Sequence, residues 1–185
     1  MKATKFFGFF MIGLFQIFLC NPVFAEHQTL SLETDLAAAA APYRRIGYDL
    51  EIWLYPWLAV GAGREVDTGL DTKNFIQDAD TNKPLTLRFV FSGFFVKFSS
   101  LERQYRIEKK DSSTPIGTTS EPKRKANLTG ARTSLGYWYE WDSLFFTIGV
   151  FQESLSTHKF AFNDETTKEV GGDLSGPFLT IGVAF

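Results

Sequence analysis

Apolar and polar residues alternate with a period of two along most of the chain. In RIGYDLEIWL, residues 45–54, all even positions are apolar: Ile46, Tyr48, Leu50, Ile52 and Leu54. The odd positions of the same stretch include Asp49 and Glu51. Because successive side chains of a β-strand point to opposite faces, this period predicts strands with one apolar and one polar face.

Segments with this alternation are expected to form eight strands, at residues 28–36, 44–54, 58–66, 84–91, 94–107, 131–141, 144–156 and 176–185. Three connections, at 55–57, 92–93 and 142–143, are short. The other four, at 37–43, 67–83, 108–130 and 157–175, are mostly long and polar. Short and long connections in alternation predict an up-and-down antiparallel meander. After Ser99 the apolar phase changes, with Leu101 and Ile107 on the other face, which predicts a β-bulge.

The strand lengths are close to the 9–11 residues that a tilted strand needs to cross hydrocarbon. We therefore expect an all-β fold, an eight-stranded antiparallel up-and-down transmembrane β-barrel, because only a closed sheet pairs every backbone group in lipid. The polar face, which also carries Glu33 and Glu153, then lines the interior. We expect it to hold an ion-pair network of Asp49, Glu51, Arg88, Lys97, Arg132 and Glu140.

The placement of aromatic residues separates this fold from soluble alternatives. A soluble sheet with a solvated polar face explains the alternation equally well, and a secreted lipocalin also has eight strands, but a lipocalin needs apolar residues inside. Aromatic residues gather at the short connections, which predicts a belt at the lipid headgroups formed by Trp53, Tyr55, Trp57, Tyr139 and Trp141.

The first 25 residues have the organisation of a secretory signal peptide. Lys2 and Lys5 precede an apolar run, and Val23 and Ala25 are small residues at the expected cleavage site. We expect residues 1–25 to be removed and residues 26–185 to form one barrel domain. The only cysteine, Cys20, lies in the leader, so the mature domain would form no disulfide. Its 17 basic and 21 acidic residues do not suggest a nucleic-acid partner.

The chain ends in FLTIGVAF, with an apolar residue at every second position: Leu179, Ile181, Val183 and Phe185. This ending resembles the last strand of Gram-negative outer-membrane barrels, and the whole mature chain resembles the small eight-stranded barrels of the OmpA, OmpX and OmpW kind. The resemblance implies a bacterial outer-membrane location. It also implies contact with outer-membrane lipid and lipopolysaccharide, and recognition of the last strand by the barrel assembly machinery.

The sequence offers one weak enzymatic pattern. Ser156 and His158 share a strand face, with Glu153 on the other, and these residue types can form a nucleophile, a base and an acid. Lipid A deacylases of the PagL kind carry such a triad, but there the histidine precedes the serine. With two histidines and no mature cysteine, we expect no metal site and no cofactor.

The longest connection carries a basic cluster that could contact anionic surface ligands: Lys109, Lys110, Lys123, Arg124 and Lys125. Three functions stay open. The first is a barrel with a plugged polar lumen that acts in envelope integrity, or in surface interaction through its loops. The second is a lipid A-modifying acyl hydrolase, and the third is a lateral channel for small apolar molecules, as in OmpW.

Overall fold

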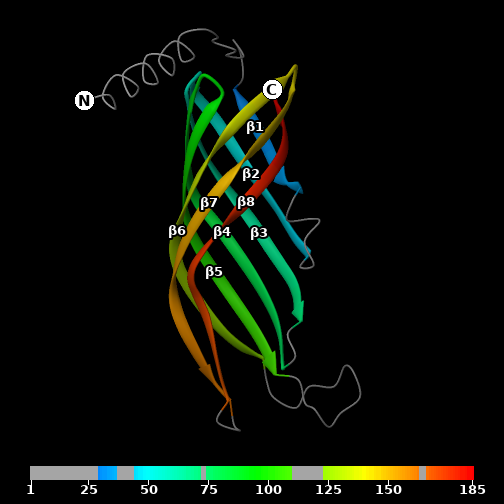
Figure 1. Cartoon of the computed structure of the whole chain (residues 1–185), viewed down its shortest axis with the longest axis vertical. Helices are drawn as coiled ribbons and strands as arrows, with labels where there is room; N and C mark the ends of the chain where they lie inside the picture. The colour runs from blue at the N-terminus through cyan, green and yellow to red at the C-terminus, as the bar shows by residue number, and fades with distance from the viewer. Residues whose placement is uncertain (1–28, 37–43, 72–73, 110–122, 163–165) are drawn as a thin grey trace, which may run out of the picture.

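Eight antiparallel strands form a closed barrel in which each strand pairs with its neighbours in the chain and β1 pairs with β8 (Figure 1). The computed structural model describes residues 29–36, 44–71, 74–109, 123–162 and 166–185. The expected signal peptide, Cys20, Lys110 and the alanine-rich stretch at 37–42 lie outside these residues. The predicted eight-stranded up-and-down β-barrel is confirmed.

The strands become longer toward the C-terminus. Their bounds are β1 Leu30–Asp35, β2 Arg44–Tyr55, β3 Leu58–Asp71, β4 Phe75–Phe91, β5 Phe94–Lys109, β6 Arg124–Trp141, β7 Leu144–Ala161 and β8 Thr167–Ala184. The short β1, which is the weakest strand signal in the sequence, is present and pairs on both sides. None of the described residues forms a helix long and apolar enough to cross a membrane.

The last residues close the barrel. The carbonyl oxygen of Phe185 accepts hydrogen bonds from the backbone N–H groups of Thr29 (2.7 Å) and Leu30 (3.2 Å). The Phe185 N–H donates to the carbonyl of Leu30 (2.9 Å). The two chain ends of the described barrel therefore meet beside the three short turns, at one end of the molecule (Figure 1).

Where the structure describes them, the long polar connections expected from the sequence are mostly strand. β4 begins at Phe75 instead of residue 84, β6 at Arg124 instead of 131, and β8 at Thr167 instead of 176, while β7 continues to Ala161. These extensions alternate too, but with polar residues outside and apolar residues inside, and short polar runs of this kind are easily read as loops. The predicted loop boundaries were wrong for this reason.

The bulge lies on β4, not on β5. Burial alternates without interruption from Phe94 to Ile107 on β5, so the predicted bulge after Ser99 was wrong. On β4 the register shifts between Asn82 and Thr86, and Lys83 and Thr86 both point inward. Pro84, which has no N–H to donate, lies in this bulge. β5 is a regular strand, and its apolar pattern changes phase because the apolar residues lie outside in one part of the barrel and inside in the other.

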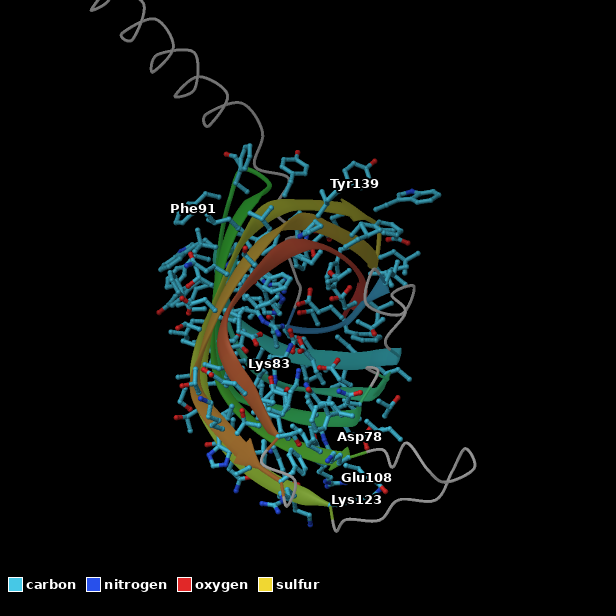
Figure 2. All side chains as sticks on the ribbon, turned by 60° about the horizontal axis from the view of Figure 1, so that its bottom comes forward. Asp78, Lys83, Phe91, Glu108, Lys123 and Tyr139 are labelled. Carbon is cyan, nitrogen blue, oxygen red and sulfur yellow. The ribbon has the colours of Figure 1, made fainter. Side chains whose placement is uncertain are left out.

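The barrel divides into two parts of opposite polarity. We call residues 30–35, 46–62, 86–98, 133–150 and 178–185 the short-turn half, and residues 64–82, 100–109, 123–131, 152–162 and 166–176 the long-hairpin half. In the short-turn half the outward side chains are apolar and the inward ones include most of the buried charges. Figure 2 shows Phe91 and Tyr139 outside one end of the barrel, Lys83 inside, and Asp78, Glu108 and Lys123 around the other end.

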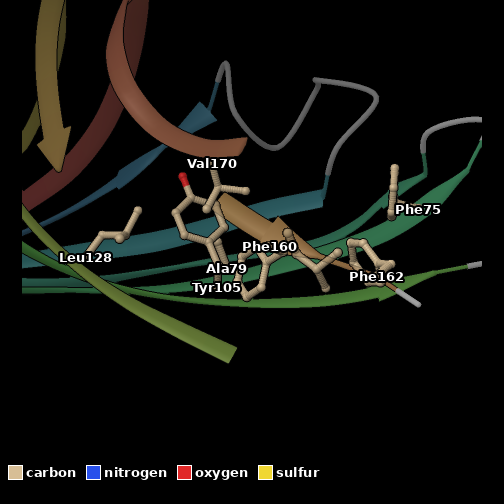
Figure 3. Close-up of a cluster of buried hydrophobic side chains, with 8 residues drawn as sticks. Phe75, Ala79, Tyr105, Leu128, Phe160, Phe162 and Val170 are labelled. Carbon is tan, nitrogen blue, oxygen red and sulfur yellow. The ribbon is translucent and has the colours of Figure 1, made fainter. Parts of the chain in front are cut away.

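Each half has its own apolar cluster inside. In the long-hairpin half, the side chains of β4–β8 pack together as Phe75, Ala79, Tyr105, Ile107, Leu128, Phe160, Phe162 and Val170 (Figure 3). In the short-turn half, a second cluster contains Val90, Phe95, Trp138, Phe145 and Ala184. Charged side chains fill much of the interior between these two clusters.

Candidate functional site: a chain of buried ion pairs

Five acids and five bases inside the barrel form one connected chain in which the charges alternate. Its members, in the order of their contacts, are Glu51, Arg88, Glu33, Lys97, Asp49, Lys83, Glu65, Arg132, Glu153 and Arg103. They come from β1 to β7 and all point inward, since each occupies the inward phase of its strand. We call this set the ion-pair chain.

Its first part crosses from β4 and β5 to β1 and β2. Arg88 contacts Glu51 (Nε to Oε2, 3.0 Å) and Glu33 (Nη2 to Oε1, 2.5 Å). Lys97 contacts Glu33, Asp49 (Oδ2, 2.5 Å) and Glu51 (Oε1, 3.0 Å). Two bases thus contact three acids, and the next base along the chain compensates the remaining negative charge.

That base is Lys83, which the β4 bulge turns inward. Its ammonium group lies 2.5 Å from Asp49 Oδ1 and 2.9 Å from Glu65 Oε1. The bulge is held by Ser100, whose hydroxyl accepts from the Leu85 N–H (3.2 Å) and donates to the Leu85 carbonyl (3.3 Å). The bulge therefore has an electrostatic consequence, because it places a lysine between two carboxylates.

The second part of the chain continues toward the long hairpins. Arg132 bridges Glu65 (2.5 Å) and Glu153 (2.6 Å) with separate guanidinium nitrogens. Arg103 binds the other oxygen of Glu153 (2.6 Å) and donates from Nε to Thr81 (2.6 Å). Carboxylates held by guanidinium groups in this way gain geometric specificity as well as energy.

Deep burial makes these contacts necessary. The chain includes Arg88 and Glu153, both 0% exposed, and Glu51, 1% exposed. An isolated charge in such surroundings costs many kcal/mol, whereas a pair with complementary hydrogen bonds offsets much of that cost. Small residues give the charges room: a Cβ at Gly63 would lie 1.8 Å from Asp49 Oδ1, and one at Gly61 2.7 Å from Glu51 Cγ.

Aromatic rings close the interior on the short-turn side of the ion-pair chain. The Arg88 guanidinium lies 4.9 Å from the Trp138 ring centroid and 5.1 Å from that of Phe95. Trp138 in turn stacks on Phe145 at 3.9 Å. Contacts of this kind between a guanidinium and an aromatic face add about 0.5–2 kcal/mol each.

The structure brings together five of the six residues predicted for the interior network. Asp49, Glu51, Arg88, Lys97 and Arg132 all belong to the ion-pair chain. Glu140 follows Trp138 by two residues toward the short turn, so the Trp138–Phe145 stack separates it from the chain. The prediction failed for Glu140 because odd or even position along a strand gives the face on which a side chain lies, but not its position along the barrel axis.

The prediction missed Lys83, Glu65 and Arg103. Lys83 was assigned to a loop, and Arg103 was placed beyond a bulge that does not exist. Glu65 had a usable signal, because it follows Gly61 and Gly63 at the same parity. Glu33 and Glu153 were expected on the polar face and lie there, both buried.

The residues predicted for the aromatic belt do not all lie on the outer surface. Tyr55, Trp57, Tyr139 and Trp141 are exposed next to the short turns. Trp53 is the exception: it packs edge-on against Trp138, with ring centroids 5.5 Å apart, and donates to Ser31 Oγ (3.1 Å). It has the inward parity of Asp49 and Glu51, so its assignment to the belt was wrong. Leu179, Ile181, Val183 and Phe185 share the outward parity of β8.

The weak catalytic pattern is not assembled. The Glu153 carboxylate is inside the barrel, bound by Arg103 and Arg132. Ser156 and His158 are exposed, and Ser156 Oγ accepts from the Thr129 backbone N–H (3.1 Å). His158 packs edge-on against the Phe160 ring, 4.7 Å away. No group of residues among those described has the composition of a metal site.

The four described residues of the basic cluster lie at or next to strand ends, and Lys110 is outside the described residues. Lys109 ends β5, and Lys125 is exposed on β6. Lys123 Nζ lies 3.2 Å from Glu108 Oε2, and the Arg124 guanidinium lies 5.1 Å from the Phe162 ring centroid. Lys123 and Arg124 thus already have local partners.

Known structures share this fold at low sequence identity. A major outer membrane protein of Thermus thermophilus is 13% identical, with a TM-score of 0.56 over 84% of this chain and 98% of that chain. The N-terminal β-barrel domain of Pseudomonas aeruginosa OprF (11% identity, TM-score 0.48, 85% and 98%) and Neisserial surface protein A (9%, 0.45, 84% and 94%) are less similar. No protein-family model and no curated protein sequence matches the chain. The resemblance to outer-membrane barrels is confirmed at the level of the fold.

Proposed function

We propose that this chain is an integral outer-membrane β-barrel protein with a closed polar lumen, which acts in envelope integrity or in surface interaction through its long hairpins. The exterior of the short-turn half is the observation that carries the proposal. Its outward side chains form an apolar band around the barrel, including Ile52, Leu135, Ile148 and Val150, all more than half exposed. Water does not favour so large an apolar surface, and hydrocarbon does.

The dimensions of the band support a membrane location. On β2 the outward apolar residues run from Ile46 to Leu54, a distance of roughly 20 Å along the barrel axis at about 3.3 Å per residue and a tilt of about 40°. That is close to the apolar band of about 25 Å in bacterial barrels. Tyr55, Trp57, Tyr139 and Trp141 edge it on the short-turn side, where an interfacial aromatic girdle belongs.

The orientation follows from the connections. Bacterial barrels have short turns on the periplasmic side and longer connections outside. We infer that the long-hairpin half, with its polar exterior, projects from the outer surface of the cell. Outer-membrane lipid, lipopolysaccharide and the assembly machinery that reads the last strand are the partners this orientation implies. Removal of residues 1–25 as a leader is part of the proposal.

The ion-pair chain supports a closed lumen. Its members fill the interior with neutralised charge, and the Trp138–Phe145 stack lies across the short-turn end. We expect purified protein in planar bilayers to give no steady single-channel current across a range of voltages. Regular conductance steps in the reconstituted protein would contradict a closed lumen.

Neither alternative function gains support from the geometry. An acyl hydrolase needs its acid beside its histidine, whereas the Glu153 carboxylate is bound inside the barrel by Arg103 and Arg132. His158 is exposed further along β7, against the Phe160 ring. A channel for small apolar molecules needs an apolar path, and charged residues cross the interior at the level of the apolar band. Unchanged lipid A acyl chains on expression, measured by mass spectrometry, are the expected result.

The membrane location is tested by fractionation and gel migration. Expressed with its own leader, the chain is expected in the outer-membrane fraction and in detergent extracts, and boiled and unboiled samples are expected to migrate differently because a closed barrel resists dodecyl sulfate. A folded monomer that stays soluble in plain buffer without detergent would refute the proposal.

A further inference from the structure

The pairing of β6 with β7 stops before either strand ends. Their register ends at Gly130 and Leu155, although residues 124–129 of β6 and 156–161 of β7 continue beyond it as strand. All of these residues are described, and none has a register partner on the other strand. Figure 1 shows β6 ending together with β5, while the β7–β8 hairpin ends apart from them. We call the space between these two stretches the β6–β7 notch.

The β7–β8 hairpin bends away from β6 at a defined point. The register of β7 with β8 shifts just after Leu155, and opposite this bulge Gly171 and Gly172 both have a φ of 89°. Bulges bend a strand and positive φ favours glycine, so the bend is built into the sequence. At the same level the Thr129 backbone N–H donates to Ser156 Oγ (3.1 Å). A side chain there takes the place of a backbone carbonyl, and beyond it the two strands separate.

The edge of β6 directs backbone groups into the notch. In a strand the N–H and C=O groups of successive residues point to opposite edges in turn. Since the Thr129 N–H points toward β7, the backbone groups of Lys125 and Asn127 point the same way. Those of Ala126 and Leu128 point toward β5, with which this stretch is paired. A row of backbone groups without a neighbouring strand is a template for one.

The edge of β7 is open on the facing side. The Phe162 N–H donates to the Thr166 carbonyl (2.9 Å) on the β8 side. By the same alternation, the backbone groups of Lys159 and Ala161 point away from β8 and toward β6. The notch is therefore bordered by two strand edges of this chain, both within the described residues.

The notch has an inner floor made of side chains. The Arg124 guanidinium of β6 lies 5.1 Å from the Phe162 ring centroid. Leu128 Cδ1 lies 2.8 Å from the place where a Cβ on Gly171 would be, so Leu128 packs against the bend itself. Because these contacts close the inner side, the notch is a docking edge in the outer wall and does not lead into the lumen. A strand added there needs small side chains facing inward.

The outward side chains at the notch are basic. Lys125 on β6 and Lys159 on β7 border it and are exposed, and Arg106 of β5 is directly opposite Lys125. Like charges in direct opposition destabilise a sheet. The nearest acids in the ladders, Asp78 opposite Arg106 and Glu169 opposite Lys159, lie on the far side of each strand from the notch. An acidic strand between Lys125 and Lys159 would complement this charge.

We propose that the β6–β7 notch is a docking edge for an extended acidic segment of a partner protein, which adds to β6 as a further strand. Its backbone pairs with Lys125 and Asn127, its acidic side chains point outward between Lys125 and Lys159, and its inward side chains are small. A second copy of this chain fits less well, because antiparallel pairing of two β6 edges brings the bases of both copies together. The proposal deepens the surface-interaction part of the proposed function and rests on it.

Hydrogen exchange read by NMR on the purified barrel in detergent tests the edge. In the free protein the amides of Lys125 and Asn127 are expected to exchange fast, and those of Ala126 and Leu128, which face β5, slowly. The probe is a short peptide of alternating Ser and Glu with blocked ends. A saturating amount is expected to slow exchange at Asn127 about tenfold. Slow exchange at Asn127 in the free barrel, or no change with the peptide, would overturn the proposal.

Variants test the backbone pairing by fluorescence anisotropy of the labelled peptide. Asn127→Pro removes the N–H that faces the notch and leaves the β5 pairing intact, and it is expected to weaken binding about tenfold. Asn127→Ala loses the same side-chain bond to Gln104 but keeps the N–H, and it is the matched control with unchanged affinity.

Charge is tested in the same assay. Lys125→Gln is expected to weaken binding about threefold, whereas Lys168→Gln, the same change on β8, is expected to have no effect. A peptide of alternating Ser and Lys is expected not to bind. Equal binding of the two peptides, or equal affinity of Asn127→Pro and Asn127→Ala in barrels that still shift on heating, would overturn the docking edge. The membrane location, which the gel shift tests separately, would stand.

Discussion

In the short-turn half the outward residues are apolar and the inward ones include most of the buried charges, whereas in the long-hairpin half the outward residues are mostly polar and an apolar cluster lies inside. On β7, for example, Ile148 and Val150 are exposed on the short-turn side of Glu153, while Leu155 and Phe160 are buried on its other side. Outside the long hairpins, polar pairs face the solvent, such as Arg64 with Asp80 (2.6 Å) and Gln104 with Asn127 (3.1 Å). In the proposed membrane location, one continuous sheet therefore meets two solvents.

The comparison shows that alternation along a strand says nothing about which face is the inner one. In hydrocarbon the outer face must be apolar, and the small lumen then takes the polar side chains, which pair with each other. In water the same barrel buries its apolar face, as a soluble protein does. In the proposed membrane location, the change of solvent falls near Arg103, Arg132 and Glu153, where the ion-pair chain ends.

The largest expected effect comes from removing one buried charge of the short-turn half. Glu51→Leu leaves Arg88 and Lys97 with an uncompensated charge, and we expect a loss of about 3–5 kcal/mol in the free energy of unfolding. Urea unfolding in lipid vesicles measures it. Leu50→Val, one residue along and facing outward, is the control and is expected to change stability by less than about 1 kcal/mol. Equal effects at the two positions would mean that inside and outside are assigned wrongly.

A smaller effect is expected from an outward charge, and it depends on the half. Ile148→Arg puts a cation on the apolar band, at an expected cost of about 2–4 kcal/mol if it lies near the middle of the bilayer. Asn127→Arg, also outward but in the long-hairpin half, is expected to cost almost nothing. The same unfolding experiment compares the two, and a similar cost for both would remove the boundary between the halves.

The smallest expected effect is at the β4 bulge. Ser100→Ala removes the hydroxyl that binds both backbone groups of Leu85, and we expect a loss of about 1 kcal/mol in the free energy of unfolding. Ser154→Ala, which removes an exposed bond to Asp173, serves as the comparison and is expected to cost less. No loss at Ser100 would mean that the bulge is held by the strands alone.

The sequence was sufficient to predict the number of strands, their order, and which side chains of the short-turn half face inward. These features are local, because the side-chain period and the turn spacing are written along the chain. Most of the interior network could be named from parity, since Asp49, Glu51, Arg88 and Lys97 alternate with clearly apolar neighbours.

The sequence was not sufficient where the environment changes. The positions of Leu101 and Ile107 suggested a change of phase, because apolar residues were expected to face outward along the whole strand. Trp53 was assigned to the aromatic belt because of its residue type. Lys83 could not be placed, since a bulge shifts parity by one and only the pairing with β3 and β5 reveals it.

The amino-acid sequence by itself determined the period of two, the positions of the short turns and the apolar last strand. Only the tertiary structure decided which face is inside along each stretch and which charges meet. The physical reason is that a strand fixes the directions of its side chains locally, whereas the medium and the partners that they meet depend on closure of the whole barrel.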